Sequence, residues 1–187
     1  MTSAIPPSVN HYLSYRVVTN SKGRPMAVSY KTKEAKTYQS DFADYVRREV
    51  AAQGWERSEN DRQHYYADAV FYFDKTNMDC NNYFKVLLDA ITDTGLVWPD
   101  DNVVCERVQR IYYDNENPRV ELTISPADYI GIFNDVPQME RFVSRCFGCT
   151  RYKRNCSVLR NARECRVQDG VTPELCSFYK QRKDYIE

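Results

Sequence analysis

The hydrophobic and polar positions of the chain follow two periods, and the changes between them predict the order of helices and strands. Residues 65–73 are aromatic and β-branched and alternate with period two, which predicts a strand. Residues 32–52 and 81–93 carry apolar residues at helical spacing, which predicts two helices. Three further strands are expected at residues 12–19, 103–113 and 119–124.

Turn-forming residues separate these segments. Residues 20–24 predict a turn or a mobile basic loop between the first strand and the first helix. Residues 114–118 lie between the last two strands, which are therefore expected to form a hairpin. The periodic pattern ends near residue 126. The sequence thus predicts one domain over residues 1–126, a linker over 127–142 and a separate segment over 143–187.

Composition excludes some classes of protein. The 187 residues are 42% hydrophobic and 28% charged, as is ordinary for globular proteins. No apolar run of about 18 residues predicts a membrane span, and residues 1–7 lack the basic and apolar regions of a signal peptide. We therefore expect a cytoplasmic protein, in which clustered cysteines bind metals or stay as thiols rather than form disulfides.

The formal net charge is zero, but the charges are unevenly distributed. The first 50 residues and the last 51 are basic, whereas the stretch between them is strongly acidic. An acidic centre between basic flanks fits a protein that holds cations in the middle and phosphates at the edges, although solvated surface charge gives the same pattern.

The densest candidate chemistry lies between residues 79 and 101. Asp79 stands at the predicted start of a helix, and Asn81, Lys85 and Asp89 follow at spacings of four along one helix face. The pair Asp100-Asp101 comes where the chain returns toward a strand. Such oxygens suit Mg²⁺, which activates water and neutralises a scissile phosphate, and a nearby lysine stabilises developing negative charge.

Each of these residues alone has a simpler explanation. Asp79 can be a helix cap, Lys85 and Asp89 a surface ion pair, and Asp100-Asp101 part of a turn. Their order and spacing together favour a hydrolytic site. The two histidines, His11 and His64, lie outside any metal-ligand spacing and are expected to be structural or on the surface.

The same stretch resembles a known family. The motif D-x-D-N-x-x-K-x-x-x-D-A, followed by an Asp-Asp pair, is typical of the RusA family of Holliday junction resolvases. Here the matching residues are Asp79-Cys80-Asn81-Asn82-Tyr83-Phe84-Lys85-Val86-Leu87-Leu88-Asp89-Ala90 and Trp98-Pro99-Asp100-Asp101. The start Pro6-Pro7-Ser8-Val9-Asn10 and the strand Pro118-Arg119-Val120-Glu121-Leu122 also resemble the family. The resemblance covers roughly residues 4–125.

The resemblance implies an α/β (α+β) fold, with a small mixed sheet, packed helices and an intertwined homodimer. It implies a bacterial or phage-encoded enzyme that resolves four-way DNA junctions with two paired nicks and serves DNA recombination and repair. Asp79 and Asp101 would bind Mg²⁺, Lys85 would be the catalytic lysine, and Asn82 would be the motif's asparagine, near the DNA.

One departure from the motif concerns the metal. Asn81 stands where the family has its second aspartate, and its amide oxygen would ligate Mg²⁺ without supplying charge. Either Asp74, Asp89 or Asp100 compensates, or the protein is a weaker nuclease than its relatives. A protein that binds junctions without cutting them is the extreme case.

The C-terminal segment has its own candidate chemistry. Five of the seven cysteines lie between residues 146 and 176, beginning with a C-x2-C pair. A short basic segment of this kind buries little apolar core, which favours stabilisation by a bound metal ion. We expect Zn²⁺ on Cys146, Cys149, Cys156 and Cys176, with Cys165 as the alternative ligand. An iron–sulfur cluster also takes four thiolates, and a tail of unligated thiols is the remaining possibility.

Basic residues near these sites are candidates for DNA contact. They are Lys22 and Arg24 in the predicted loop and Arg151, Lys153 and Arg154 in the cysteine segment. Besides the nuclease, two functions stay open: a zinc-stabilised protein that binds branched DNA with weakened or lost nuclease activity, and a regulatory zinc protein that binds other proteins. Salt-sensitive DNA affinity would argue against the last.

Overall fold

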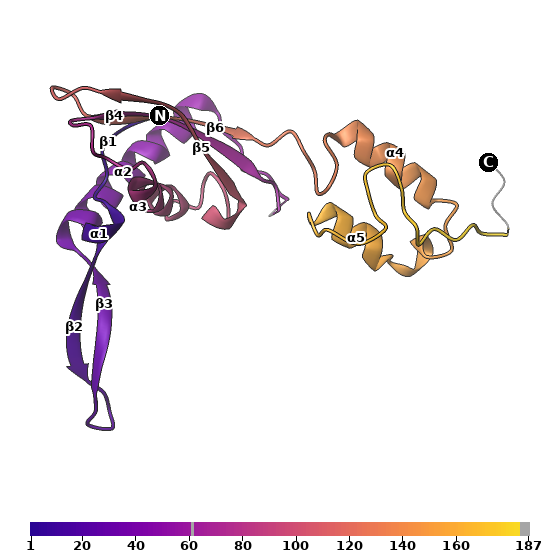
Figure 1. The fold of residues 1–187 in the computed structure, drawn as a ribbon, viewed down its shortest axis with the longest axis horizontal. Coiled ribbons are helices and arrows are strands. Elements are labelled where there is room, and N and C mark those ends of the chain that lie inside the picture. Colours follow the sequence, from indigo (N-terminus) through magenta and orange to yellow (C-terminus); the bar gives the residue numbers. More distant parts are fainter. Residues whose placement is uncertain (61, 184–187) are drawn as a thin grey trace. The chain divides into compact units, whose positions relative to one another are not determined.

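The computed structural model describes residues 1–60 and 62–183, with Lys153 described only in its backbone. The chain forms two compact units. The N-terminal unit comprises residues 1–60 and 65–125, and the C-terminal unit comprises residues 62–64 and 126–183. Figure 1 colours the chain from indigo to yellow along its length. No helix in either described part is both long enough and apolar enough to cross a membrane.

The main sheet of the N-terminal unit has four strands in the order β1-β6-β4-β5. β1 (Thr2–Ala4) is antiparallel to β6 (Arg119–Pro126), and β4 (Tyr65–Phe73) is parallel to β5 (Val104–Tyr113). The sheet is therefore mixed, within an α+β fold, as expected. β4 confirms the predicted strand at residues 65–73, and β5 and β6 confirm the predicted strands that follow.

The predicted hairpin of β5 and β6 is wrong, because β4 lies between these two strands. The turn-forming residues at 114–118 correctly indicate that the chain reverses direction. They do not indicate that β4 pairs between the two strands they connect. Instead of closing a hairpin, the connection passes the end of β4, where the backbone N–H of Asp114 donates to the carbonyl oxygen of Phe73 at 2.7 Å.

Strand β4 organises the core of the N-terminal unit. Its residues alternate between buried and half-buried positions, so one face is apolar and covered. Helices α2 (Lys33–Gln53) and α3 (Asn81–Thr92) supply the covering side chains, including Phe42 and Leu87. Full burial of a side chain such as Phe71 contributes about 1.5–3 kcal/mol. Both helices confirm the predicted helical segments.

A bulge interrupts the pairing of β4 with β5. Ala69 pairs with Val108 but Val70 pairs with Arg110, so Gln109 is an extra residue on β5. Because side chains alternate across a strand, this insertion changes which residues of β5 face the helices. Before the bulge these are the even-numbered residues from 104 to 108, and after it they are 111 and 113.

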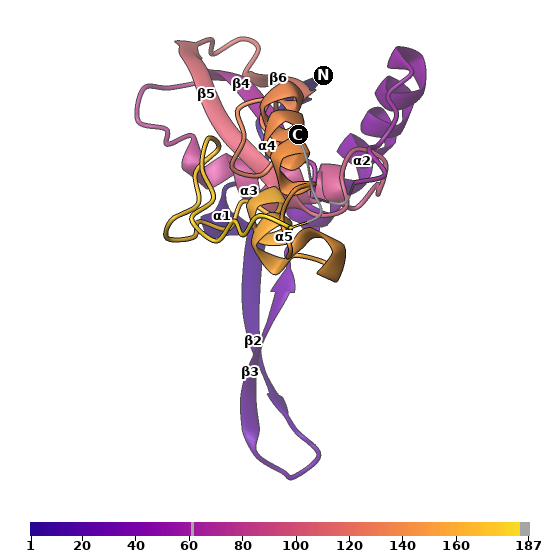
Figure 2. The ribbon, with the colours of Figure 1, turned by 90° about the vertical axis from the view of Figure 1, so that its right-hand side faces the viewer.

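A two-stranded hairpin extends away from the helices and the sheet of the N-terminal unit (Figures 1 and 2). β2 (Leu13–Thr19) pairs with β3 (Pro25–Lys31), in a register that runs from Leu13 opposite Lys31 to Thr19 opposite Pro25. Most of its residues are exposed on both faces. β3 was not predicted, since a strand without a buried face has no clear alternation.

The loop at the tip of this hairpin confirms the predicted turn. The side-chain oxygen of Asn20 accepts hydrogen bonds from the backbone N–H groups of Lys22 and Arg24, at 2.9 and 3.0 Å. Gly23 adopts a φ of 71°, which a side chain would strain. At the base of the hairpin, Tyr12 is buried and ends the short helix α1 (Val9–Tyr12). The sequence had instead predicted Tyr12 as the first residue of the strand.

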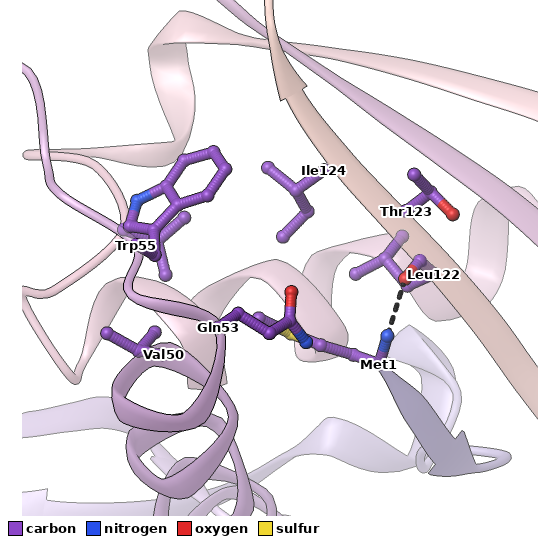
Figure 3. A pocket seen from close by; sticks show the side chains of 8 residues that line it. Met1, Val50, Gln53, Trp55, Leu122, Thr123 and Ile124 are labelled. Atoms are coloured by element: carbon purple, nitrogen blue, oxygen red, sulfur yellow. Dashed lines mark hydrogen bonds between the residues drawn. The ribbon is translucent and has the colours of Figure 1, made fainter.

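The amino end packs beside β6. The terminal amine of Met1 donates to the carbonyl oxygen of Leu122 at 2.9 Å (Figure 3). Around it, Val50 of α2, Trp55 just beyond the end of α2 and Ile124 of β6 line a small hollow. These contacts close the sheet edge where β1 joins β6.

The C-terminal unit is built from short elements. They are α4 (Val136–Cys146), the 3-10 turn η2 (Tyr152–Arg154) and α5 (Ser157–Arg163). α4 lies partly within residues 127–142, which had been expected to form a linker, and the Asp135 carboxylate caps it by accepting from the N–H of Gln138 at 2.6 Å. Its apolar residues Met139, Phe142 and Val143 lie at helical spacing, a signal that the sequence prediction did not use.

A small apolar core holds the C-terminal unit together. Phe133 and Phe142 pack at 5.1 Å between ring centroids, and Leu159 and Ala162 of α5 join them. Gly131 allows this approach, because a Cβ there would stand 2.1 Å from the carbonyl oxygen of Ala162.

Candidate active site

The start of α3 presents two of the predicted site residues to solvent. Asp79 and Asn81 are exposed, and a carboxylate oxygen of Asp79 accepts from the backbone N–H of Asn81 at 3.0 Å. Cys80 is the N-cap residue and makes no capping bond through its side chain. Asp79 therefore stabilises the first turn from one position further out, and part of its carboxylate stays open.

Lys85 lies at the centre of a charged cluster on the exposed face of α3. Its ammonium donates to the Asp89 carboxylate at 2.8 Å and lies 3.7 Å from the Asp101 carboxylate. The spacing of four residues within the helix accounts for the first contact. The hydrogen bond with Asp89 raises the pKa of Lys85 most, and the charges of Asp89 and Asp101 raise it further, against the lowering effect of partial burial, so the lysine stays positively charged.

Asp89 connects Lys85 to Tyr12 through its two carboxylate oxygens. Its second oxygen accepts from the Tyr12 hydroxyl at 2.7 Å. Burial by itself would raise the pKa of Asp89, but the hydrogen bonds from Lys85 and Tyr12 lower it below the ordinary value, with help from the charge of Lys31. Asp89 is thus an ionised, mostly buried carboxylate that fixes the direction of Lys85.

Asp101 opens the short 3-10 turn η1 (Asp101–Val103), which leads into β5. The preceding Trp98 is fully buried, which fixes the chain at this point, and Asp100 caps the turn by accepting from the N–H of Asn102 at 3.1 Å. Burial, a hydrogen bond with Asp100 and the charges of Asp89 and Asp100 raise the pKa of Asp101, against the effect of Lys85.

Glu106 is a member of this site that the sequence reasoning missed. It lies on β5 before the bulge and pairs with the buried Ala67, so its side chain faces the helix layer. Partial desolvation and the charge of Asp101 raise the pKa of Glu106, while Lys85 opposes the change. The alternation of β5, counted from Val104, could have placed it beside Asp101.

The structure thus joins Lys85, Asp89 and Asp101 directly. Asn81 stands one helical turn before Lys85, or about 6 Å along the axis, and no ion pair links Asp79 to that cluster in residues 1–60 and 62–183. Of the possible substitutes for the missing aspartate, Asp89 and Asp100 lie on the Lys85 side. Asp74 instead lies on the Asp79 side. Burial raises the pKa of Tyr83 most, and the charges of Asp74 and Asp79 raise it further, so both carboxylates lie near this tyrosine.

No metal site is preassembled in the part of the chain that the structure describes. There, no group of three or more His, Cys, Asp or Glu side chains is already arranged to hold a metal ion. The histidines lie elsewhere: His11 lies 3.4 Å from the Ser8 hydroxyl, and His64 lies 2.6 Å from the Tyr129 hydroxyl.

The predicted DNA-contacting residues occupy three places. Lys22 and Arg24 are exposed at the tip of the β2–β3 hairpin. Asn82 is half-buried in the first turn of α3. Arg151 and Arg154 are exposed in the C-terminal unit, and the Arg151 guanidinium lies 5.5 Å from the ring centre of Phe178. The side chain of Lys153 lies outside the described residues.

The seven cysteines fall into three groups. No disulfide forms among them. Burial, followed by the neighbouring sulfurs of Cys176, Cys149 and Cys156, raises the pKa of the Cys146 thiol to about 11. Cys165 instead donates to the carbonyl oxygen of Gly131 at 3.2 Å. Two more, Cys80 and Cys105, lie in the N-terminal unit.

Comparison with known proteins assigns the N-terminal unit. No curated protein matched the chain. The sequence model of a family described as "Endodeoxyribonuclease RusA" matches residues 6–125, which include the whole Lys85 cluster and end where the C-terminal unit begins. The match spans more than half of the chain, and the chain therefore belongs to the RusA family of Holliday junction resolvases.

Proposed function

We propose that this protein is a Mg²⁺-dependent endonuclease that resolves four-way DNA junctions by paired hydrolysis of phosphodiester bonds, as a homodimer. Its family acts on DNA as an endodeoxyribonuclease and generally depends on divalent metals. The observation that carries the proposal is the contact of Lys85 with both Asp89 and Asp101, at one end of the sheet and within the family match.

The donor groups around Lys85 fit a hard divalent cation. Asp101 and Glu106 both have raised pKa values, partly because neighbouring carboxylates repel a further negative charge. A cation would relieve this repulsion, and carboxylate and amide oxygens are the ligands that Mg²⁺ prefers. Asp79, Asn81 and Asp101 would hold the ion, which supplies an acidic bound water and charge neutralisation at the phosphate.

Lys85 would act on the scissile phosphate. Asp89 holds its ammonium from one side, and Tyr12 in turn holds Asp89, so the lysine is preorganised rather than free to sample many rotamers. A positive charge fixed where negative charge develops stabilises the transition state without reorganisation. In this scheme Lys85 contacts the phosphate oxygens, and Asp89 is a positioning residue.

DNA affinity would come from the basic flanks. The β2–β3 hairpin carries Arg16, Lys22, Arg24 and Lys31 and no acidic residue, so it fits a ribbon that follows a phosphate backbone. Asn82, at the start of α3, would contact DNA next to the cut site. Arg151, Lys153 and Arg154 would add phosphate contacts from the C-terminal unit.

Two features of the sheet support a dimer. β5 is an edge strand, and Val108, Ile111 and Tyr113 on it are exposed, which is unusual for large apolar side chains on a sheet. A second subunit on this surface would cover them. It would also supply the second active site that two symmetric nicks require.

The test is cleavage of a synthetic four-way junction by the wild type and by Asp101→Asn, with a linear duplex as the control substrate. We expect Asp101→Asn to lose about a hundredfold or more in single-turnover rate, since metal-bound charge contributes several kcal/mol. Junction binding should persist. Asp44→Asn removes an equally negative but exposed carboxylate in α2 and should cut normally.

The binding-only alternative is favoured by one residue, Asn81. A wild-type protein that binds junctions tightly yet leaves them intact across a Mg²⁺ titration would establish that alternative. Wild-type rates in Asp101→Asn would instead show that the assigned site is wrong.

A further inference from the structure

The C-terminal unit places four cysteines around one small core. Cys146, Cys156 and Cys176 are half-buried and pack against the cluster that contains Phe142. They come from three separate places in the sequence: the end of α4, the residue before α5 and the irregular segment that follows. Apolar packing alone does not require cysteines at these three places, because another small apolar residue would fill each of them as well.

The fourth cysteine, Cys149, is buried and joins the same region through the backbone. Its N–H donates to the carbonyl oxygen of Cys146 at 2.9 Å, which closes a tight turn over the C-x2-C pair. The N–H of Lys180 in turn approaches the Cys149 sulfur at 3.5 Å. Backbone N–H groups that point at a sulfur are the environment that stabilises a metal-bound thiolate.

The segment after Cys176 is tied to this turn. Cys149 forms an antiparallel bridge with Gln181, and the N–H of Thr150 donates to the carbonyl oxygen of Lys180 at 2.8 Å. The N–H of Tyr179 donates to the carbonyl oxygen of Cys176 at 3.1 Å, which makes a second tight turn. The segment that follows Cys176 is thus held against the turn that carries Cys149.

We propose that Cys146, Cys149, Cys156 and Cys176 bind one Zn²⁺ ion as a structural tetrathiolate site. Zn²⁺ takes four sulfur ligands tetrahedrally, at about 2.3 Å. The sulfurs of Cys176, Cys149 and Cys156 act electrostatically on Cys146, and the Cys165 thiol donates to the carbonyl oxygen of Gly131. Among the described residues, the thiols are not arranged as a complete set of ligands. Binding of the ion would therefore bring the sulfurs closer together by changes of side-chain rotamer.

The surrounding charges fit this ion. A Zn²⁺ with four thiolates carries a net negative charge, and Arg145 already acts favourably on Cys146. Soft thiolates select Zn²⁺ over Mg²⁺, so the site is chemically distinct from the carboxylates of the N-terminal unit. The proposal is independent of the proposed nuclease function, because the family match ends at residue 125.

The first experiment measures the metal content of the purified full-length protein after growth with added zinc. We expect one zinc per chain in the wild type and in Asp101→Asn, which removes a carboxylate of the other candidate site. Replacement by Co²⁺ should give the near-ultraviolet charge-transfer band of cobalt thiolate. A wild type without stoichiometric zinc, or with iron and sulfide in its place, overturns the proposal.

The second experiment compares single cysteine variants. Cys146→Ser, Cys149→Ser, Cys156→Ser and Cys176→Ser should each lose the zinc, whereas Cys165→Ser should keep it. Cys165 is a matched control, because it lies in the same unit and a serine keeps the hydrogen bond to Gly131. Retention of zinc by any of the four variants removes that cysteine from the site, and loss in Cys165→Ser contradicts the assignment.

A variant that merely misfolds would also lose zinc, so a third measurement uses the unaltered protein. Titration of the zinc-loaded wild type with a mercurial should release the ion in step with the modification of four thiols, while a zinc-binding dye records the release. Release without thiol modification, or with modification of one thiol only, would overturn the tetrathiolate.

Discussion

The two units of the chain differ in what holds them together. The N-terminal unit buries nineteen side chains in one cluster, which joins the sheet to α2 and α3. The cluster of the C-terminal unit has six, among short helices and turns. A small core supplies little stability, and small domains are commonly completed by metals or disulfides. The difference explains why chemistry based on charge sits in one unit and clustered thiols sit in the other.

The two units also differ in how firmly the residues of their candidate sites are held in place. The cluster of Lys85, Asp89 and Asp101 stands on a helix and on the connection into a strand, both fixed by buried aromatic residues such as Trp98. The four cysteines of the proposed zinc site stand at helix ends and on turns, where the chain is held by few buried side chains. Three substitutions test how far this contrast holds.

The largest effect is expected for Phe71→Ala. Removing a fully buried phenylalanine from β4 should lower the free energy of unfolding of the N-terminal unit by about 3–5 kcal/mol. Both tryptophans, Trp55 and Trp98, lie in that unit, so tryptophan fluorescence in a urea titration reports on it alone. The matched variant Phe142→Ala, in the other core, should leave this transition in place. A shared shift would mean that the two units unfold as one.

The next effect concerns Asn81→Asp, which adds the negative charge that the family motif has at this position. At limiting Mg²⁺ we expect single-turnover cleavage to rise by about tenfold, equivalent to about 1.4 kcal/mol, and at saturating Mg²⁺ the rates should converge. Asn115→Asp makes the same change in charge at an exposed turn of the same unit and should have no effect. A flat response would mean that Asp89 or Asp100 already fills the role.

The smallest effect is expected for Tyr12→Phe, which removes the hydrogen bond to Asp89. At neutral pH it should lower the free energy of unfolding by about 1 kcal/mol. The fold lowers the pKa of Asp89, so this stabilisation is present above the unfolded-state value of about 3.9 and is lost as the pH falls through the lower folded-state value.

Urea titrations of both proteins at pH 7 and near pH 3 measure this loss, and the difference between them should shrink at the acidic pH. Tyr15→Phe, on the exposed hairpin, is the control. A difference that does not depend on pH would assign the role of Tyr12 to packing rather than to Asp89.

The sequence was informative where local pattern and burial agree. β4 and α3 each have a covered face, so their periodicity predicted their bounds closely. The contact of Lys85 with Asp89 also follows from helix spacing alone. The contact of Lys85 with Asp101 needs the long-range path past Trp98, and only the family motif indicated it.

Other features are set by distant pairing, which leaves no local trace. β3 exists because β2 pairs with it, and the place of β4 between β5 and β6 depends on a parallel pairing across some thirty residues of intervening chain. Glu106 was missed for the same reason: its importance appears only once β5 lies beside β4. In the C-terminal unit, α4 was missed although Met139, Phe142 and Val143 lie at helical spacing, and because it is nearly as long as α3 its length does not account for the miss.

The extra residue Gln109 has a consequence for how this gene can change. A frame-preserving loss of that single codon would restore strict alternation along β5. The strand would then have to choose: either Glu106 keeps its place beside Asp101 and Ile111 turns to the other face of the sheet, or Ile111 keeps its face and Glu106 turns away from Asp101. Substitutions at Gln109 leave the count intact and should be common among descendants, whereas deletions there should be purged. Tolerance of insertions and deletions in this strand therefore tests whether Glu106 matters to the proposed site and Ile111 to the proposed dimer surface.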